Sequence, residues 1–220
     1  MNLKIVFQFL SNLRSNNNRE WFKKNNDKYQ NAKVEFADFI DALIPPLVDL
    51  DNDIDVESSK ECIFRIFRDL RFSKNREPYK SNFGAFIAQG GRKSPNAGYY
   101  IHFEPDHSFI GGGVYMPQPK VLKAIRDEIF KNSDNYKKII FNTNFKKYFP
   151  EIYGEKLKMA PRGFPKEFKD IELLKNKHFA VTYNVANSFW LENNLFENII
   201  KVFKVQYTFN QFLNNIIKKV

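Results

Sequence analysis

Hydrophobic side chains recur every three or four residues in the N-terminal part of the chain, which is the spacing of one face of an α-helix. The stripe of a first helix over residues 2–14 consists of Leu3, Val6, Phe7, Leu10 and Leu13. The polar run 16–18 interrupts it, and Asn18 is suited to cap a second helix. Pro45 and Pro46 predict a kink or an end of that helix near Ile44.

The pattern changes between residues 62 and 110, where hydrophobic and polar positions alternate as they do in β-strands. Two such segments, 99–103 and 108–115, flank residues 104–107, which read as a hairpin turn. The three glycines at 111–113 favour close packing or a bulge within a strand over a phosphate-binding loop. A further strand is predicted over 178–186.

Helical spacing returns over residues 119–141, where Pro119 suits a first-turn position, and again over 189–219 as one or two helices. The sequence predicts the α+β class, with an N-terminal helical pair, a central antiparallel sheet, and C-terminal helices packed on the sheet. We expect a single domain over residues 1–220.

Composition narrows the class of protein without identifying a function. A chain of 220 residues that is 43% hydrophobic can bury a core without a disulfide or metal. Its single cysteine, Cys62, excludes an internal disulfide framework and a multi-cysteine zinc site, and its apolar neighbours favour a buried residue over a reactive thiol. The histidines lack metal-ligand spacing, so we expect neither a metal nor a cofactor. No apolar run is long enough for a membrane span, and a cytoplasmic location is the default.

The formal charge of +10 raises the possibility of a nucleic-acid partner. However, lysines outnumber arginines by 26 to 9, and no known recognition motif organises the basic residues. Nucleic acid is therefore a less favoured partner than a small anionic molecule.

Arginine is concentrated in one short segment. Four of the nine arginines, Arg65, Arg68, Arg71 and Arg76, lie within twelve residues, among hydrophobic side chains. The guanidinium group suits bidentate contacts with phosphate or carboxylate. Asp69 is the carboxylate within this cluster, and we expect a strand to about Arg68 followed by a loop.

Two interpretations of the segment stay open. In the first, Arg65, Arg68 and Arg71 clamp an anion, while Asp69 orients them or accepts a proton. Arg76 adds positive charge, and Tyr79 and Lys80 contribute donors at the rim. In the second, the arginines form a structural hub of salt bridges. Whether the protein is an enzyme is uncertain.

The segment has the form R-x-x-R-D-x-R-F-x-x-x-N-R-x-x-Y from Arg65 to Tyr79. It resembles the signature of the bacterial and fungal domain of unknown function 2461, and Arg76 stands where that family usually has lysine. Similar features occur at residues 16–22, 98–100, 111–113 and 157–164. The resemblance implies no established activity. It does imply that Arg19, Glu20 and Trp21 pack towards the arginine segment.

Overall fold

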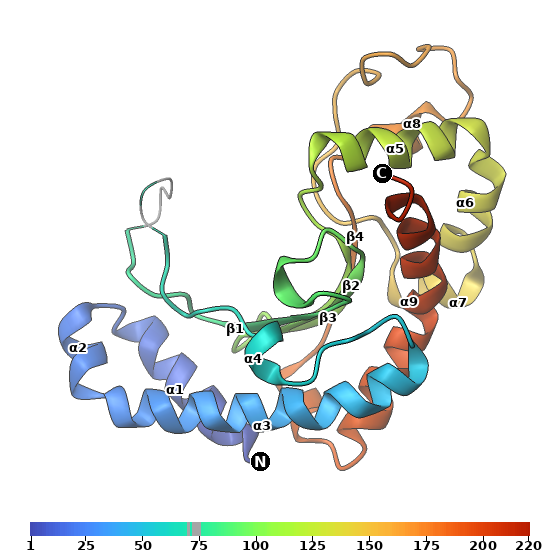
Figure 1. Cartoon of the computed structure of the whole chain (residues 1–220). Helices are drawn as coiled ribbons and strands as arrows, with labels where there is room; N and C mark the ends of the chain where they lie inside the picture. Colours follow the sequence, from blue (N-terminus) through green and yellow to red (C-terminus); the bar gives the residue numbers. More distant parts are fainter. Residues whose placement is uncertain (70, 72–75) are drawn as a thin grey trace. The chain divides into compact units, whose positions relative to one another are not determined.

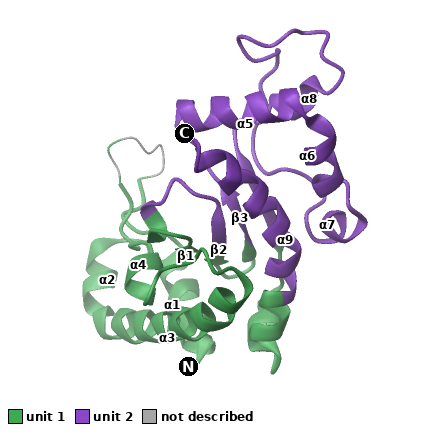
Figure 2. Cartoon of the chain, turned by 45° about the vertical axis from the view of Figure 1, so that its right-hand side comes forward, with its two compact units in different colours: residues 1–92, 100–110, 184–200 green, residues 93–99, 111–183, 201–220 purple. Residues whose placement is uncertain are grey.

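The computed structural model describes residues 1–69, 71 and 76–220. Contacts within the chain define two compact units, coloured separately in Figure 2. Unit 1 comprises 1–92, 100–110 and 184–200, and unit 2 comprises 93–99, 111–183 and 201–220. The single domain expected from the sequence stays a prediction.

The fold is α+β, as predicted. One antiparallel sheet has the strand order β1-β2-β3-β4, with bounds Phe83–Ile87, Gly98–Phe103, Phe109–Val114 and Phe179–Asn184. The N-terminal helices are α1 (Leu3–Ser15), α2 (Arg19–Lys24), α3 (Asn26–Leu50) and α4 (Ser59–Cys62). The later helices are α5 (Pro119–Lys131), α6 (Ser133–Ile140), α7 (Thr143–Tyr148), α8 (Ile171–Leu174) and α9 (Leu195–Ile217). Short 3₁₀ turns, η1 and η2, cover Gly91–Lys93 and Asn187–Leu191.

The core of unit 1 forms where α1 and α3, which run alongside each other in Figure 1, meet aromatic side chains of the sheet. Phe36 of α3 lies 5.3 Å from Phe83 of β1 and 6.1 Å from Phe103 of β2, measured between ring centroids. Phe103 in turn contacts Trp190 of η2 at 4.8 Å. This side of the sheet is therefore filled by the core.

Helix α3 continues through Pro45 and Pro46 to Leu50, so the predicted end near Ile44 is wrong, while the alternative of a kink stays a prediction. Two prolines remove two backbone donors from the helix. The side chains around them, Ile44 and Leu47, are buried, and this burial offsets the lost hydrogen bonds.

Two of the predicted helices are each divided into two in the structure, and in both cases the break lies at an asparagine. The second helix ends at Lys24, where the Asn25 side chain donates to the carbonyl of Trp21 at 2.9 Å, and α3 begins at the next residue. The predicted helix 119–141 divides at Asn132, whose side chain accepts from the backbone of Asn135 and caps α6. The cap predicted at Asn18 is confirmed, since its side chain accepts from the Trp21 N–H at 2.9 Å.

In unit 2 the C-terminal helix α9 packs on the strands, as predicted. Phe203 contacts Tyr99 of β2 at 4.9 Å, and Phe209 lies against Gly113 of β3. Close packing at the triple glycine is confirmed, because a Cβ at any of the three positions would meet backbone of a neighbouring strand. Over the described residues, no helix is long and apolar enough to cross a membrane.

Candidate functional site

The arginine segment forms an antiparallel ribbon that extends from the edge strand β1. We call residues 63–69 and 76–80 the arginine ribbon; Leu70 and residues 72–75 of the motif lie outside the described residues. Figure 1 shows its two arms side by side. Isolated bridges pair Ile63 with Ala85 and Phe67 with Tyr79. A strand was predicted up to about Arg68, and the structure has isolated β-bridges there in place of a continuous strand.

The ribbon is anchored to the N-terminal helices of unit 1. The Asn17 side chain donates to the Tyr79 carbonyl at 3.0 Å and accepts from its N–H at 3.2 Å. The Tyr79 ring stacks on Phe22 of α2, with 3.9 Å between centroids and 10° between planes. These contacts fix the arm that carries Lys80.

Asp69 and Arg71 bind each other. The Arg71 guanidinium donates to the two Asp69 carboxylate oxygens at 3.0 and 2.7 Å. These hydrogen bonds, with that from the Arg71 backbone, lower the pKa of Asp69 to about 2. Because both groups face solvent, the pair contributes little to stability. Asp69 is therefore already paired, and it is not free to neutralise Arg65, Arg68 or Arg76 of the ribbon.

Arg68 and Lys80 are partly buried and lie close together. Arg68 Nη2 donates to the Tyr79 carbonyl at 3.3 Å and lies 3.7 Å from a Glu77 oxygen. Its Nε is buried and has no hydrogen-bond partner among the described residues. Burial lowers the pKa of Lys80, and the positive charges of Arg65 and Arg68 lower it further.

Positive charge therefore exceeds negative charge on the described part of the ribbon. Arg65 and Arg76 are exposed, and no described carboxylate lies within ion-pair distance of Arg65 or Lys80. The Lys80 ammonium lies 5.8 Å from the centre of the Phe64 ring.

The supporting residues taken from the resemblance make contacts elsewhere. Arg19 is exposed, Glu20 pairs with Lys24 at 2.8 Å, and the Trp21 ring lies 6.2 Å from Phe9. Their role at the ribbon stays a prediction.

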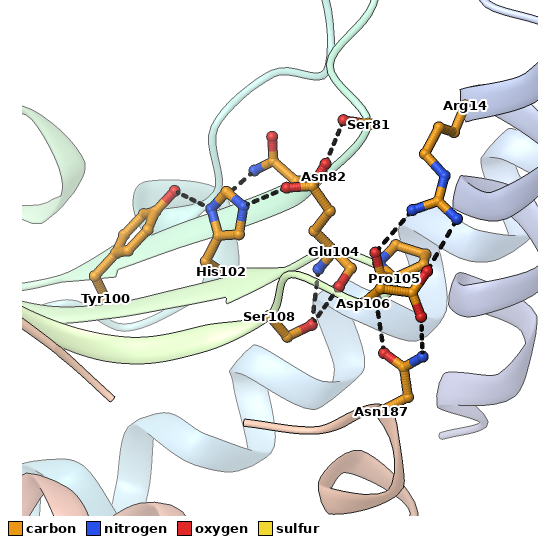
Figure 3. A network of polar contacts seen from close by, with 10 residues as sticks. All are labelled: Arg14, Ser81, Asn82, Tyr100, His102, Glu104, Pro105, Asp106, Ser108 and Asn187. Atoms are coloured by element: carbon orange, nitrogen blue, oxygen red, sulfur yellow. Dashed lines mark hydrogen bonds and ion pairs between the residues drawn. The ribbon is translucent and has the colours of Figure 1, made fainter. Parts of the chain in front are cut away.

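Sequence reasoning gave His102 only a strand role, and the structure places it at the centre of a polar network (Figure 3). In β2 the residues 99, 101 and 103 are buried in the core, so Tyr100 and His102 point to the opposite face. The His102 ring stacks on Phe109 of β3, with 4.4 Å between centroids. The available signal was the spacing Tyr-x-His-x-Glu, which places three polar side chains on one face.

His102 has partners on both ring nitrogens. Its Nε2 lies 2.9 Å from a Glu104 oxygen, and its Nδ1 lies 3.3 Å from the Tyr100 hydroxyl and 3.4 Å from the Asn82 amide nitrogen. An ionised carboxylate only accepts hydrogen bonds, so Nε2 carries the proton. In the neutral ring, Nδ1 is then the acceptor for both Tyr100 and Asn82.

Glu104 is held in its ionised form by the same network. Hydrogen bonds from His102 and from the Ser81 hydroxyl lower the pKa of Glu104 below its usual value, although burial acts in the opposite direction. The side chains of His102 and Glu104 are only 16% and 18% exposed, so solvent screens their interaction weakly.

The turn that follows Glu104 is also fixed. The predicted hairpin turn at 104–107 is confirmed by the His107 N–H bond to the Glu104 carbonyl at 3.1 Å. Arg14 of α1 donates to the Pro105 carbonyl and the Asp106 carboxylate, both at 3.0 Å, and Asn187 of η2 binds the same carboxylate (Figure 3). These bonds hold the end of β2 in register.

Phe64 connects the ribbon to the network. Its ring lies edge-on to Tyr100, at 6.3 Å between centroids, while the Lys80 ammonium lies over it. Lys80 is followed in the chain by Ser81 and Asn82, which bind Glu104 and His102. Gly84 leaves room for the Tyr100 hydroxyl, because a Cβ there would lie 2.6 Å from that oxygen. Cations and an acid–base network thus adjoin within unit 1.

Cys62 takes no part in this chemistry. It is buried, as predicted, and burial together with the charges of Glu61 and Asp41 raises the pKa of its thiol to about 12. Within the ranges that the structure describes, no group of three or more His, Cys, Asp or Glu side chains could hold a metal ion.

Glu104→Gln is expected to remove part of the acid sensitivity of the fold. Because the pKa of Glu104 is lowered in the folded protein, the carboxylate stabilises the fold above its ordinary pKa of about 4.3. That contribution is lost as the pH falls through the lowered value. The difference in free energy of unfolding between wild type and variant should therefore be full near neutral pH and shrink below about pH 4.

Urea unfolding across this pH range measures the difference. Glu167→Gln, at an exposed loop position, is the control, and a difference independent of pH would contradict the expectation.

The comparisons with known proteins give a family and no closer relative. The model of a family described as "Conserved hypothetical protein (DUF2461)" matches residues 5–212. Neither the curated proteins nor the solved structures contain a significant match to the chain.

Proposed function

The chain belongs to the DUF2461 family of conserved hypothetical proteins, and we propose that its arginine ribbon binds the phosphate or carboxylate group of a small molecule or nucleotide. The observation that carries the proposal is the concentration of cations around Lys80. Arg65 and Arg68 both repel its ammonium group, while Asp69 is bound to Arg71 and Glu77 lies 3.7 Å from Arg68. A bound anion would relieve this repulsion.

The donors of the ribbon suit an oxyanion. Arg68 has a buried Nε without a described partner, and an unsatisfied buried donor costs about 1–3 kcal/mol. An oxygen of phosphate or carboxylate accepts charge-assisted hydrogen bonds from such a guanidinium and from a neighbouring ammonium. The exposed Arg65 and Arg76 add positive charge that would attract an anion from solution.

The aromatic ring beside these cations favours a ligand with an apolar or aromatic body. Phe64 is only partly buried and lies between Lys80 and Tyr100. A base or a short carbon chain could rest on this ring while its anionic group meets Lys80 and Arg68. We place this activity in the cytoplasm, where phosphorylated small molecules are plentiful.

Lys80→Met is expected to abolish protection of the protein by phosphate compounds without lowering its stability. The ammonium is repelled by Arg65 and Arg68, so its removal should leave the melting temperature of the free protein unchanged or slightly higher. A ligand at a hundred times its dissociation constant stabilises the folded state by about 2.7 kcal/mol. Thermal melting with a panel of inorganic phosphate, nucleotides, sugar phosphates and dicarboxylates measures the protection.

The control is Lys60→Met, which removes an exposed lysine of α4 in the same unit. It should keep the full protection. Arg68→Lys tests the contribution of the Arg68 guanidinium, because lysine keeps the positive charge but lacks the planar group that donates two parallel hydrogen bonds. If no compound raises the melting temperature of the wild type, and Arg68→Lys strongly destabilises the protein, the arginines form a structural hub and the proposal is wrong.

A further inference from the structure

Tyr100, His102 and Glu104 form an ordered row of hydrogen bonds on the face of β2 away from the core (Figure 3). The row runs from the Tyr100 hydroxyl to His102 Nδ1, through the ring, and from Nε2 to Glu104. Ser81 fixes the other oxygen of Glu104, and Phe109 holds the imidazole plane by stacking. Stacking on Phe109 would explain why the His102 ring is partly buried. It would not explain why His102 Nδ1, the acceptor nitrogen, faces the Tyr100 hydroxyl.

We propose that this row is a proton relay in which the Tyr100 phenol is the catalytic acid–base group. His102 and Glu104 are positioning residues, because they act through Tyr100. The inference rests on the proposed function for its substrate, which is an anionic molecule with an ionisable hydroxyl group. Its anionic end would bind at Lys80 and Arg68, its body would lie on Phe64, and its hydroxyl would meet Tyr100.

The proton transfer balances within these residues. The Tyr100 O–H bond breaks as its proton moves to His102 Nδ1, and a new O–H bond forms at Tyr100 with the proton of the substrate hydroxyl. The substrate becomes an alkoxide, and His102 becomes an imidazolium ion beside the Glu104 carboxylate. The two opposite charges stabilise each other in a site with little solvent. Reversal of the same steps returns a proton to the product.

The geometry meets the requirements for general acid–base chemistry. The two hydrogen bonds of the row measure 3.3 and 2.9 Å, and catalytic hydrogen bonds are often long before a substrate binds. Tyr100 is partly exposed and adjoins Phe64, so a ligand on the ribbon side can approach its hydroxyl. The Gly84 position is needed for this placement, because a side chain there would displace the hydroxyl.

The test is the reactivity of Tyr100 towards benzenesulfonyl fluoride, with each tyrosine quantified by peptide mass spectrometry. The phenol oxygen forms a bond to sulfur, fluoride leaves, and His102 takes the phenol proton. Tyr115 is the internal control, since its side chain is far more exposed and would react faster if exposure alone decided the rate. We expect Tyr100 to be labelled at least about tenfold faster than Tyr115.

Two variants separate the relay from packing. His102→Phe keeps a ring on Phe109 but removes the base, and it should reduce the labelling of Tyr100 to the level of Tyr115 or below it. Glu104→Gln keeps the shape and removes the charge, and it should reduce the labelling in part. In the wild type, ¹⁵N NMR should show the His102 proton on Nε2. Circular dichroism and thermal melting establish whether the variants are folded. If His102→Phe does not fold, the labelling of Glu104→Gln decides the outcome.

The relay is refuted if Tyr100 is labelled no faster than Tyr115, if its rate is unchanged in the folded variants, or if His102 carries its proton on Nδ1. The labelling is done without any anion, so it does not depend on the ribbon. Fast labelling of Tyr100 in a protein that no phosphate compound protects would retain the relay and refute the anion site. Protection by a phosphate compound without fast labelling of Tyr100 would retain the anion site and refute the relay.

Discussion

Gly112→Ala is expected to lower the free energy of unfolding by about 4 kcal/mol or more, which is a large effect for a single substitution. A Cβ at this position would lie 2.0 Å from the Gly98 carbonyl oxygen of β2. That atom belongs to backbone inside the sheet, so it cannot move aside as a flexible side chain does. The φ angle of +144° adds strain for any residue with a Cβ. Urea unfolding measures the change.

Gly163→Ala is the matched control for this effect. Gly163 also has a positive φ, of +91°, but a Cβ there would meet nothing within 4 Å. Only the conformational cost applies, which is about 1–2 kcal/mol. If the two substitutions cost the same, the close approach of the strands at Gly112 is not what requires glycine.

Asn214→Leu is expected to lower the free energy of unfolding by about 2–5 kcal/mol. The Asn214 side chain accepts from the Ala97 N–H at 2.7 Å and donates to the Ala97 carbonyl at 3.1 Å, and these bonds are buried. Leucine would leave both backbone groups without these partners, and each unsatisfied buried group costs about 1–3 kcal/mol. The same helix face carries Gln206 and Asn210, which donate to the Gly98 carbonyl at 3.0 and 3.2 Å.

Asn215→Leu places the same substitution at the next position of α9, where the side chain is exposed. It should change stability by less than about 0.5 kcal/mol. The difference between the two variants, measured by urea unfolding, isolates the contribution of the buried amide. An equal loss in both variants would contradict a specific contribution of the buried amide, because leucine has a higher helix propensity than asparagine and propensity alone would not lower stability.

The secondary structure could be predicted from the sequence wherever it depends on residues that are only a few positions apart. The stripe beginning at Leu3 formed α1, because an amphipathic helix needs only a partner for its apolar face. The Asn18 cap and the turn at 104–107 were also predictable, since each depends on side-chain and backbone groups within four residues.

Local rules failed where burial outweighed them. Pro45 and Pro46 would end an isolated helix, but α3 continues because Ile44 and Leu47 are buried in the core. The sequence also allowed two meanings for three consecutive glycines. Only the approach of neighbouring strands decided that Gly112 is needed for close packing.

The sequence by itself determined the class of fold, its family resemblance and the concentration of arginines, because these depend on composition, periodicity and motif spacing. The tertiary structure alone decided which side chains share a site. Spacing of two residues placed Tyr100, His102 and Glu104 on one face, yet it could not show that Ser81, Asn82 and Phe64 from another segment lie beside them. Such contacts join residues about twenty to forty positions apart, and they arise from strand pairing, which the chain reaches only when it folds.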